Sequence, residues 1–255
     1  MTRGQHAVLI VAAVATAAVS PVSAQSVAPT LACVAPPGFA RFDTPLKRVA
    51  ARISAHQPLT IVAIGSSSTF GLGASSPAMS YPSRLAVELR ALLPRTSITV
   101  INRGVNGETA REMLARFDRD VFAADPDLVL WQVGSNAVLL GKPIAPTGLL
   151  IGEGVRRLKV AGSDVVLIDP QYAPKVIAKH DEHDVDLMVA LISTASRDMH
   201  VNLFQRFALM RLTKGLPFSA FLSKDELHMN DWSYGCIAKL LGRAVAEAAT
   251  RVTVR

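Results

Sequence analysis

The stretch Leu59-Thr60-Ile61-Val62-Ala63-Ile64 runs without a break into Gly65-Ser66-Ser67-Ser68-Thr69-Phe70-Gly71. A continuous apolar run of this length is typical of a strand buried on both faces, as in a parallel sheet. In α/β enzymes the reactive groups lie just outside the carboxyl ends of such strands, which is where the Ser- and Gly-rich turn would stand here. This stretch therefore predicts both the fold class and the edge of the sheet that carries chemistry.

Similar apolar runs recur along the chain and alternate with helical patterns. The runs rich in Val and Ile lie at 59–64, 98–101, 127–133 and 164–168, with a weaker one at 201–204. The helical patterns lie at Ser83–Leu93, Glu108–Val121, Gly148–Val160, Val185–Arg197 and Trp232–Val252. Strands that alternate with helices favour a parallel sheet covered on both faces.

Three further polar segments follow at intervals that an α/β sheet could bring together. They are Asn102-Arg103-Gly104-Val105-Asn106-Gly107, Gly134-Ser135-Asn136 and Asp225-Glu226-Leu227-His228. A serine hydroxyl is a poor nucleophile, so it needs a neighbouring base and donors that hold the developing oxyanion. A serine turn followed by Gly, Asn, Asp and His segments therefore predicts a serine hydrolase.

Together the four segments resemble the four sequence blocks of the SGNH hydrolase superfamily, the GDSL-type esterases and lipases. These blocks are Gly-Asp-Ser, Asn-x-Gly-x-x-Gly, Gly-x-Asn-Asp and Asp-x-x-His, and the similar segments run in the same order from Gly65 to His228. The resemblance implies a three-layer α/β/α sandwich, flavodoxin-like, with a five-stranded parallel sheet. It also implies catalysis without a metal or an organic cofactor.

Carried over by position, the resemblance makes Ser67 the nucleophile, His228 the general base and Asp225 the acid that orients the imidazole. The oxyanion hole would consist of the backbone N–H groups of Ser67 and Gly107 and the side-chain amide of Asn136.

Two positions depart from the pattern. Ser66 replaces the Asp of Gly-Asp-Ser, and Ala137 replaces the Asp of Gly-x-Asn-Asp. Because neither position belongs to the triad or the oxyanion hole, we expect the departures to affect how the loops are held rather than the type of reaction.

Two other groups of residues invite a functional interpretation. Gln171 and Tyr172 follow the apolar run 165–168, at the edge where substrate-contacting loops belong. The segment His180-Asp181-Glu182-His183 could suggest a metal site, but no further ligands are identifiable, so we predict a solvated helix start and no metal.

The first 24 residues have the pattern of a secretory signal peptide. Arg3 precedes an apolar stretch from Ala7 to Val19, and the small-residue site Val22-Ser23-Ala24 predicts cleavage after Ala24. No later charge-free stretch reaches membrane-spanning length. We therefore expect an exported protein, periplasmic or secreted, with an N-terminal strap at 25–44 and a hydrolase domain at 45–255.

Cys33 and Cys236 are the only cysteines, and an even pair in an oxidising compartment predicts a disulfide. The alternatives are two separate thiols, or a lipoprotein site at Cys33; the second is disfavoured because Thr30 stands where that signal has Leu.

The net charge of +7 is scattered along the chain, and aromatic residues make up only 5% of it, so we expect no nucleic-acid partner. The expected partner is instead an ester substrate: an acylated glycan, a small molecule or a lysolipid. Because no long apolar insertion could form a lid, acetyl and short-acyl esters are favoured. Two other functions stay open, a non-catalytic envelope module that binds glycan or lipid and an O-acyltransferase that uses the same acyl-enzyme.

Overall fold

A computed structural model describes Met1 and residues 32–36, 38–178 and 182–251. The chain divides into two compact units, Met1–Ala32 and Cys33–Arg255, and the fold is that of the second unit. Apart from Met1, the predicted signal peptide lies outside the described residues. The same holds for the start of the predicted strap and for His180 and Asp181.

The core of the fold is one parallel sheet with the strand order β2-β1-β3-β4-β5. Its strands are β1 (Leu59–Gly65), β2 (Ile98–Gly104), β3 (Leu128–Gln132), β4 (Asp164–Ile168) and β5 (Asn202–Phe204). The chain leaves β1 for β2 on one side and then returns to place β3 on the other. In α/β folds, ligands bind outside the carboxyl ends of the strands at the point where the strand order reverses in this way.

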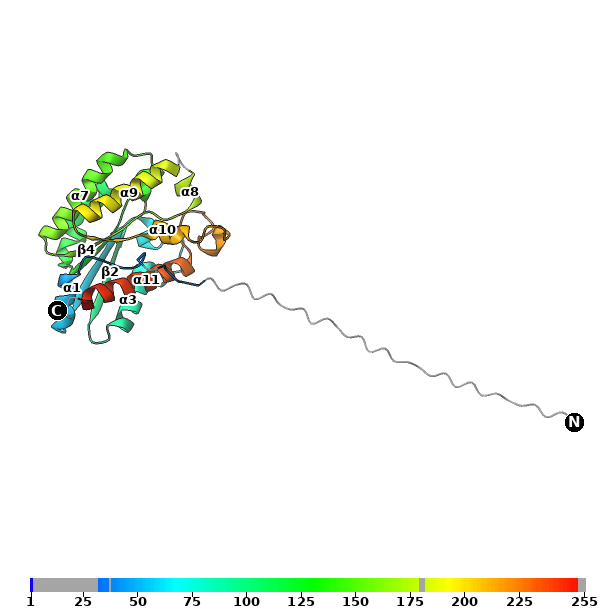
Figure 1. Cartoon of the computed structure of the whole chain (residues 1–255), viewed down its shortest axis with the longest axis horizontal. Coiled ribbons are helices and arrows are strands. Elements are labelled where there is room, and N and C mark those ends of the chain that lie inside the picture. The colour runs from blue at the N-terminus through cyan, green and yellow to red at the C-terminus, as the bar shows by residue number, and fades with distance from the viewer. Residues whose placement is uncertain (2–31, 37, 179–181, 252–255) are drawn as a thin grey trace. The chain divides into compact units, whose positions relative to one another are not determined.

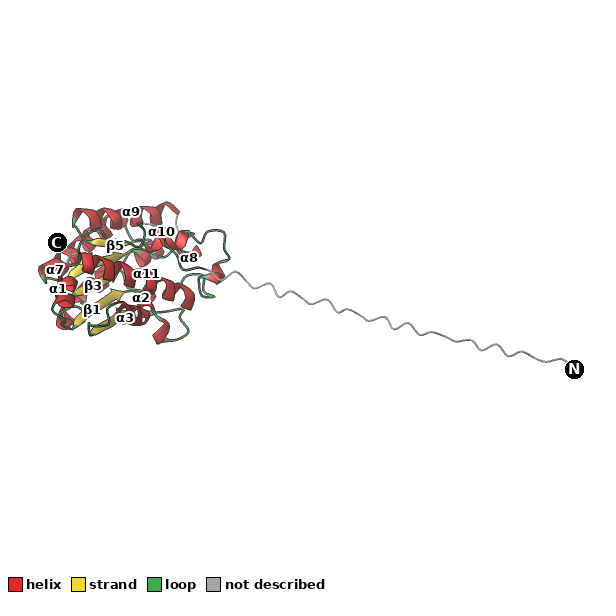
Figure 2. Cartoon of the chain, turned by 60° about the horizontal axis from the view of Figure 1, so that its bottom comes forward, coloured by secondary structure: helices red, strands yellow, loops and turns green. Residues whose placement is uncertain are grey.

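Helices cover both faces of this sheet, as Figures 1 and 2 show. The α-helices are α1 (Lys47–Ser54), α2 (Ser67–Phe70), α3 (Tyr81–Leu92), α4 (Ala110–Ala115), α5 (Phe117–Asp120), α6 (Ser135–Leu139), α7 (Ile144–Val160), α8 (Pro174–Ile177), α9 (Glu182–Asp198), α10 (Arg206–Arg211) and α11 (Asp231–Thr250). Short 3₁₀ turns lie at Pro77–Met79, Phe122–Ala124 and Phe218–Ala220. In Figure 1, α7 and α9 lie on one side of the sheet, and α1, α3 and α11 lie on the other. The predicted three-layer α/β/α sandwich is confirmed.

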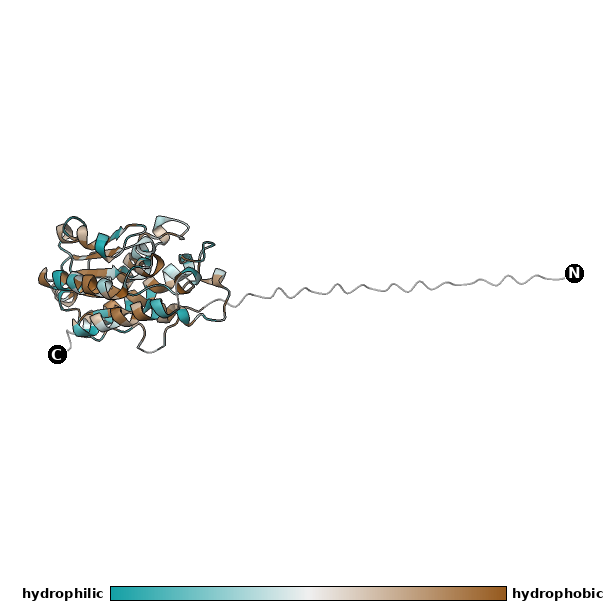
Figure 3. Ribbon diagram, turned by 90° about the horizontal axis from the view of Figure 1, so that it is seen from above, coloured by the Kyte–Doolittle hydropathy of each residue, from teal (hydrophilic) through white to brown (hydrophobic). Residues whose placement is uncertain are grey.

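The central strands β1, β3 and β4 are apolar because they are buried between these layers, and Figure 3 shows brown, hydrophobic ribbon in the middle of the domain. Trp131 of β3 is fully buried and packs edge-on against Phe117, with ring centroids 5.2 Å apart. A Cβ at Gly154 would come within 2.3 Å of the Trp131 ring. The missing side chain at Gly154 therefore lets α7 lie directly on the sheet.

The five predicted strands and four of the five predicted helices match observed elements to within a few residues, whereas α1, α2, α6, α8 and α10 were not predicted. The predicted helix Glu108–Val121 is divided into α4 and α5, and Arg116 ends the first helix and precedes the second. At Arg116 the backbone leaves the helical region, with φ −112° and ψ 8°. The periodic apolar pattern runs through this break, which is why the sequence predicts one helix there.

The described part of the predicted strap is attached to the domain at its two ends. Asn202 of β5 accepts a hydrogen bond from the Thr44 N–H and donates one to the Thr44 carbonyl. Cys33 is joined to Cys236 of α11 by a disulfide across 203 positions of sequence. Among the described residues, no helix is both long enough and apolar enough to cross a membrane.

Candidate active site

Ser67 lies where β1 turns into the short helix α2. Ser66 has extended backbone angles and precedes the helix, so Ser67 is its first residue and is partly exposed. Gln132 at the end of β3 holds this turn, because its Oε1 accepts hydrogen bonds from the Ser66 N–H (2.8 Å), the Ser66 hydroxyl (2.9 Å) and the Thr69 hydroxyl (3.3 Å). The hydroxyl of Ser66, which stands where the Gly-Asp-Ser block has Asp, is thus buried and hydrogen-bonded to the neighbouring strand β3.

Ser67, His228 and Asp225 form one hydrogen-bonded chain. His228 Nε2 lies 2.8 Å from Ser67 Oγ, and His228 Nδ1 lies 2.5 Å from Asp225 Oδ2. The histidine is 6% exposed, and a Cβ at Gly73 would come within 2.8 Å of its Cβ. Ser67 and His228 lie 161 positions apart in the sequence. The fold therefore brings the predicted nucleophile, base and acid together in the order that nucleophilic catalysis requires.

The backbone around Asp225 is arranged to keep its carboxylate ionised. Its Oδ1 accepts hydrogen bonds from the Ser223 hydroxyl (2.6 Å) and from the N–H groups of His228 (2.9 Å) and Leu227 (3.0 Å). Burial acts to raise the pKa of Asp225, but the hydrogen bonds from Ser223 and His228 outweigh it and hold this pKa well below its usual range. The side chain is therefore an anion at neutral pH.

The amide of Asn136 is fixed by the loop after β2. Its Nδ2 donates to the Glu108 carbonyl at 2.8 Å, which leaves the second N–H of the same amide for another acceptor. Gly107 in that loop has a φ of +80°, and a Cβ added there would meet no atom within 4 Å. Ser67, Gly107 and Asn136 thus follow β1, β2 and β3 at the same edge of the sheet.

The sequence profile of the non-GDSL lipase-like family matches residues 32–251. The chain belongs to this family. The predicted relationship to the SGNH hydrolases, the GDSL-type esterases and lipases, is confirmed by this family match.

Among curated proteins, an acetylxylan esterase of Geobacillus stearothermophilus is 42% identical over 50 residues. That match covers 20% of this chain and 23% of the relative, so it spans less than a quarter of the relative's length.

Solved structures with the same fold include three esterases or acylhydrolases. The crystal structure of an acetylxylan esterase from G. stearothermophilus superposes with a TM-score of 0.64 at 21% identity, over 73% of this chain and 94% of that one. A two-domain esterase active on acetylated mannans superposes with a TM-score of 0.69 at 19% identity, over 83% of this chain and 55% of that one. A lipase/acylhydrolase from Enterococcus faecalis superposes with a TM-score of 0.62 at 20% identity, over 74% of this chain and 96% of that one. At such low identity the likeness is one of fold, and the expectation of an ester-hydrolysing enzyme agrees with it.

In this member of the non-GDSL lipase-like family, the side chains of Gln171 and Tyr172 are buried. Gln171 is 2% exposed, and its Oε1 accepts hydrogen bonds from the Ser135 hydroxyl (2.8 Å) and from Arg206 (3.1 Å). Tyr172 is buried against Phe207 and Phe218. Both residues follow β4 as predicted, and their side chains lie largely within the domain.

Sequence reasoning missed the buried residues that support the nucleophile turn. Arg206 is 1% exposed and donates to Ser68 Oγ (2.9 Å) and the Asp169 carbonyl (2.9 Å), in addition to Gln171. Arg116 lies on the other side of the turn and donates to the Gly65 carbonyl. No motif in the sequence marks either arginine, because their partners lie far from them along the chain or on other elements.

In the part of the chain that the structure describes, no three His, Cys, Asp or Glu side chains gather as a metal site would require. The helix α9 begins at Glu182, and His183 in its first turn is exposed to solvent. His180 and Asp181 of the same segment lie outside the described residues.

Proposed function

We propose that this protein is an exported serine esterase that cleaves acetyl or other short-acyl esters of a glycan or small molecule. The observation that carries the proposal is the hydrogen-bonded chain from Ser67 through His228 to Asp225 at the carboxyl edge of the sheet. A module that only binds glycan or lipid would need no base aligned on a serine hydroxyl.

In the proposed first step, Ser67 Oγ attacks the ester carbonyl carbon while its proton passes to His228 Nε2. The carbonyl oxygen becomes an oxyanion that the N–H groups of Ser67 and Gly107 and the Asn136 amide would stabilise. The ionised Asp225 stabilises the imidazolium. Collapse of this intermediate breaks the ester C–O bond, and His228 gives its proton to the departing alcohol.

In the second step, water takes the place of the alcohol. His228 accepts a proton from the water as it attacks the acyl carbon, and a second oxyanion forms and collapses. The acid is released and the proton returns to Ser67 Oγ. Hydrolysis therefore returns the enzyme to its starting state without a cofactor. The preference for acetyl esters is supported by the relatives, which are an acetylxylan esterase and an esterase active on acetylated mannans.

The deciding experiment is covalent labelling with a fluorophosphonate. We expect an adduct on Ser67 that is lost in Ser67→Ala and in His228→Ala. Ser75→Ala is the matched control, because the Ser75 hydroxyl also has a carboxylate partner, Asp231 at 2.6 Å, and lies in the loop that follows α2. A folded native protein without an adduct would favour the binding module. Hydrolysis of p-nitrophenyl acetate and octanoate then reports the acyl length.

Export is tested on the same protein. Intact-mass analysis of the protein recovered outside the bacterial cytoplasm should give a chain that begins at Gln25. A full-length product that starts at Met1 in the cytoplasm would contradict the proposed signal peptide.

A further inference from the structure

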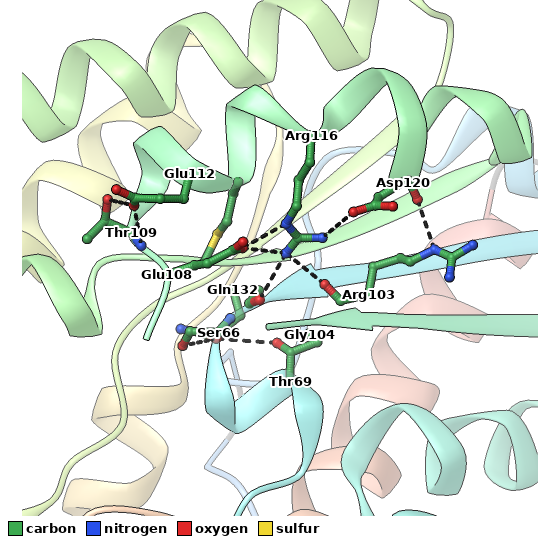
Figure 4. A network of polar contacts seen from close by, with 12 residues as sticks. Ser66, Thr69, Arg103, Gly104, Glu108, Thr109, Glu112, Arg116, Asp120 and Gln132 are labelled. Atoms are coloured by element: carbon green, nitrogen blue, oxygen red, sulfur yellow. Dashed lines mark hydrogen bonds and ion pairs between the residues drawn. The ribbon is translucent and has the colours of Figure 1, made fainter. Parts of the chain in front are cut away.

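Arg116 lies at the break between α4 and α5 and has an unusual number of partners for a buried cation (Figure 4). Its side chain is 7% exposed. Glu108 Oε2 lies 2.7 Å from both Nε and Nη2, and Asp120 Oδ2 lies 3.0 Å from Nη1. Nη2 also donates to the carbonyls of Arg103 (2.9 Å) and Gly65 (3.3 Å). One guanidinium thus joins two carboxylates to the ends of two strands.

These partners surround the loop that connects β2 to α4. Arg103 lies just before this 104–109 loop and Glu108 lies near its end, so the guanidinium holds both ends of the segment that contains Gly107. Gly65 ends β1, two positions before Ser67. On its other side the loop accepts the Asn136 amide at the Glu108 carbonyl. Each proposed oxyanion donor is therefore tied, directly or through one residue, to a group that Arg116 contacts.

We propose that Arg116 is a positioning residue for ester cleavage. Together with Glu108, it sets the distances between the Ser67 N–H, the Gly107 N–H and the Asn136 amide, without contacting the substrate itself. This inference rests on the proposed function. Electrostatic stabilisation of an oxyanion depends on donors that are already in place, and a displacement of 1 Å can cost about 10²-fold in rate.

The planar guanidinium is suited to this task. It offers five N–H donors in a fixed fork, whereas a lysine ammonium is a point charge on a flexible stem. Glu108 and Asp120 are each 14% exposed, so loss of the cation would leave two nearly buried carboxylates without this partner. A lysine would keep the charge but could not reach all of these acceptors at once.

The test compares Arg116→Lys with Arg119→Ala. Arg119 pairs with the same Asp120, at 2.9 Å through Nε and 2.9 Å through Nη2, but its side chain is 76% exposed and donates to no group of the 104–108 loop. In the folded variants, we expect Arg116→Lys to lower kcat for p-nitrophenyl acetate by about 10²-fold, with a much smaller change in KM. Arg119→Ala should stay within about twofold of the native kcat.

A second variant and a readout independent of turnover separate positioning from mere stability. Glu108→Gln keeps an acceptor for Arg116 without the charge, and we expect a smaller loss of kcat than in Arg116→Lys. Amide hydrogen exchange of the 104–109 segment should be faster in Arg116→Lys and unchanged in Arg119→Ala. Exchange at 225–228 should be unchanged in both variants, as should the pH midpoints of kcat.

The outcomes are distinguishable. A native protein that labels on Ser67 and a folded Arg116→Lys with native kcat would overturn the inference and leave the proposed function standing. The inference is likewise overturned if Arg116→Lys lowers only the melting temperature while exchange at 104–109 stays native. A native protein that neither labels nor hydrolyses any ester would refute the proposed function, and the inference with it.

Discussion

Asn136 is the donor whose removal gives the clearest test of the oxyanion hole. Its side chain donates to the Glu108 carbonyl, so it is held in place before any ester arrives. We expect Asn136→Ala to lower kcat for p-nitrophenyl acetate by about 10²–10³-fold, because the transition state loses one fixed donor. Circular dichroism and melting temperature are the controls for folding. A variant with native kcat would remove Asn136 from the mechanism.

Asp169, buried behind the nucleophile turn, gives a pH-dependent prediction. Burial raises its pKa to about 7, although hydrogen bonds from the backbone of Phe207 and the charge of Arg206 oppose the shift. A carboxyl in the unfolded chain has a pKa of about 3.9, so between these values the folded state binds more protons and loses stability as the pH rises. Above about pH 7 this loss is complete.

Asp169→Asn removes that titration while keeping an oxygen for the Phe207 N–H, which donates to Asp169 Oδ1 at 2.8 Å. We therefore expect the melting temperature of the variant, relative to the native protein, to increase between pH 4.5 and pH 7.5 and to stay level above. Differential scanning calorimetry at several pH values measures this difference. A constant difference across the range would mean that Asp169 does not titrate there.

The sequence identified the residues that would react but not those that hold them. Ser67, Asp225 and His228 stand in short motifs, and the structure brings the three side chains together. Arg206 meets Ser68 across 138 positions, and Gln132 meets Ser66 across 66, with no local pattern around either. A buried polar residue in an apolar run can be placed only when its partner is known. Gln171 shows the same limit, since the sequence places it after β4 but does not reveal its partners Ser135 and Arg206.

Among the elements, α2 and β2 approach each other most closely beside the nucleophile. A Cβ at Gly104, the last residue of β2, would lie 2.0 Å from the Phe70 backbone nitrogen in α2. Neither strand nor helix could yield at that distance without moving Ser67. Position 104 therefore needs glycine for packing, whereas position 107 needs glycine for its positive φ.

We expect Gly104→Ala to lower the free energy of unfolding by about 1–3 kcal/mol and to lower kcat at the same time. Gly152→Ala is the control: this glycine lies inside α7, and its Cβ would meet only Met199 Sδ, at 4.0 Å. Alanine should stabilise that helix by up to about 1 kcal/mol. Urea unfolding and esterase assays measure both. Native stability in Gly104→Ala would mean that α2 can shift freely.

The element pattern shows how far periodicity can be used. It placed all five strands, most clearly β1, β3 and β4, because parallel strands buried on both faces read as apolar runs. The periodic pattern merged α4 and α5 into one helix because Phe117 continues the apolar face. The break at Arg116 instead accompanies its hydrogen bonds to Gly65, Arg103 and Glu108. Helix ends set by distant partners leave no mark on local sequence.

Across the whole domain, the disulfide joins Cys33, near the start of the folded unit, to Cys236 in α11. The Cys33–Cys236 bond closes a loop of 203 positions, and cross-links over long loops restrict the unfolded chain. We expect the double variant Cys33→Ser, Cys236→Ser to lose about 2–4 kcal/mol of unfolding free energy. Reduced native protein should show the same loss in urea. Equal stability of oxidised and reduced protein would show that the bond contributes nothing.

The same bond makes the folded chain a covalent ring from position 33 to position 236, and this ring contains every strand together with Ser67, Asp225 and His228. A protease that cuts the ring once opens it without releasing a fragment. The nicked protein should run as one band on a non-reducing gel and as two after reduction, while its serine and histidine remain on the same covalent assembly. Resistance to a single cut is thus a property that this protein owes to its disulfide connectivity rather than to the packing of its core.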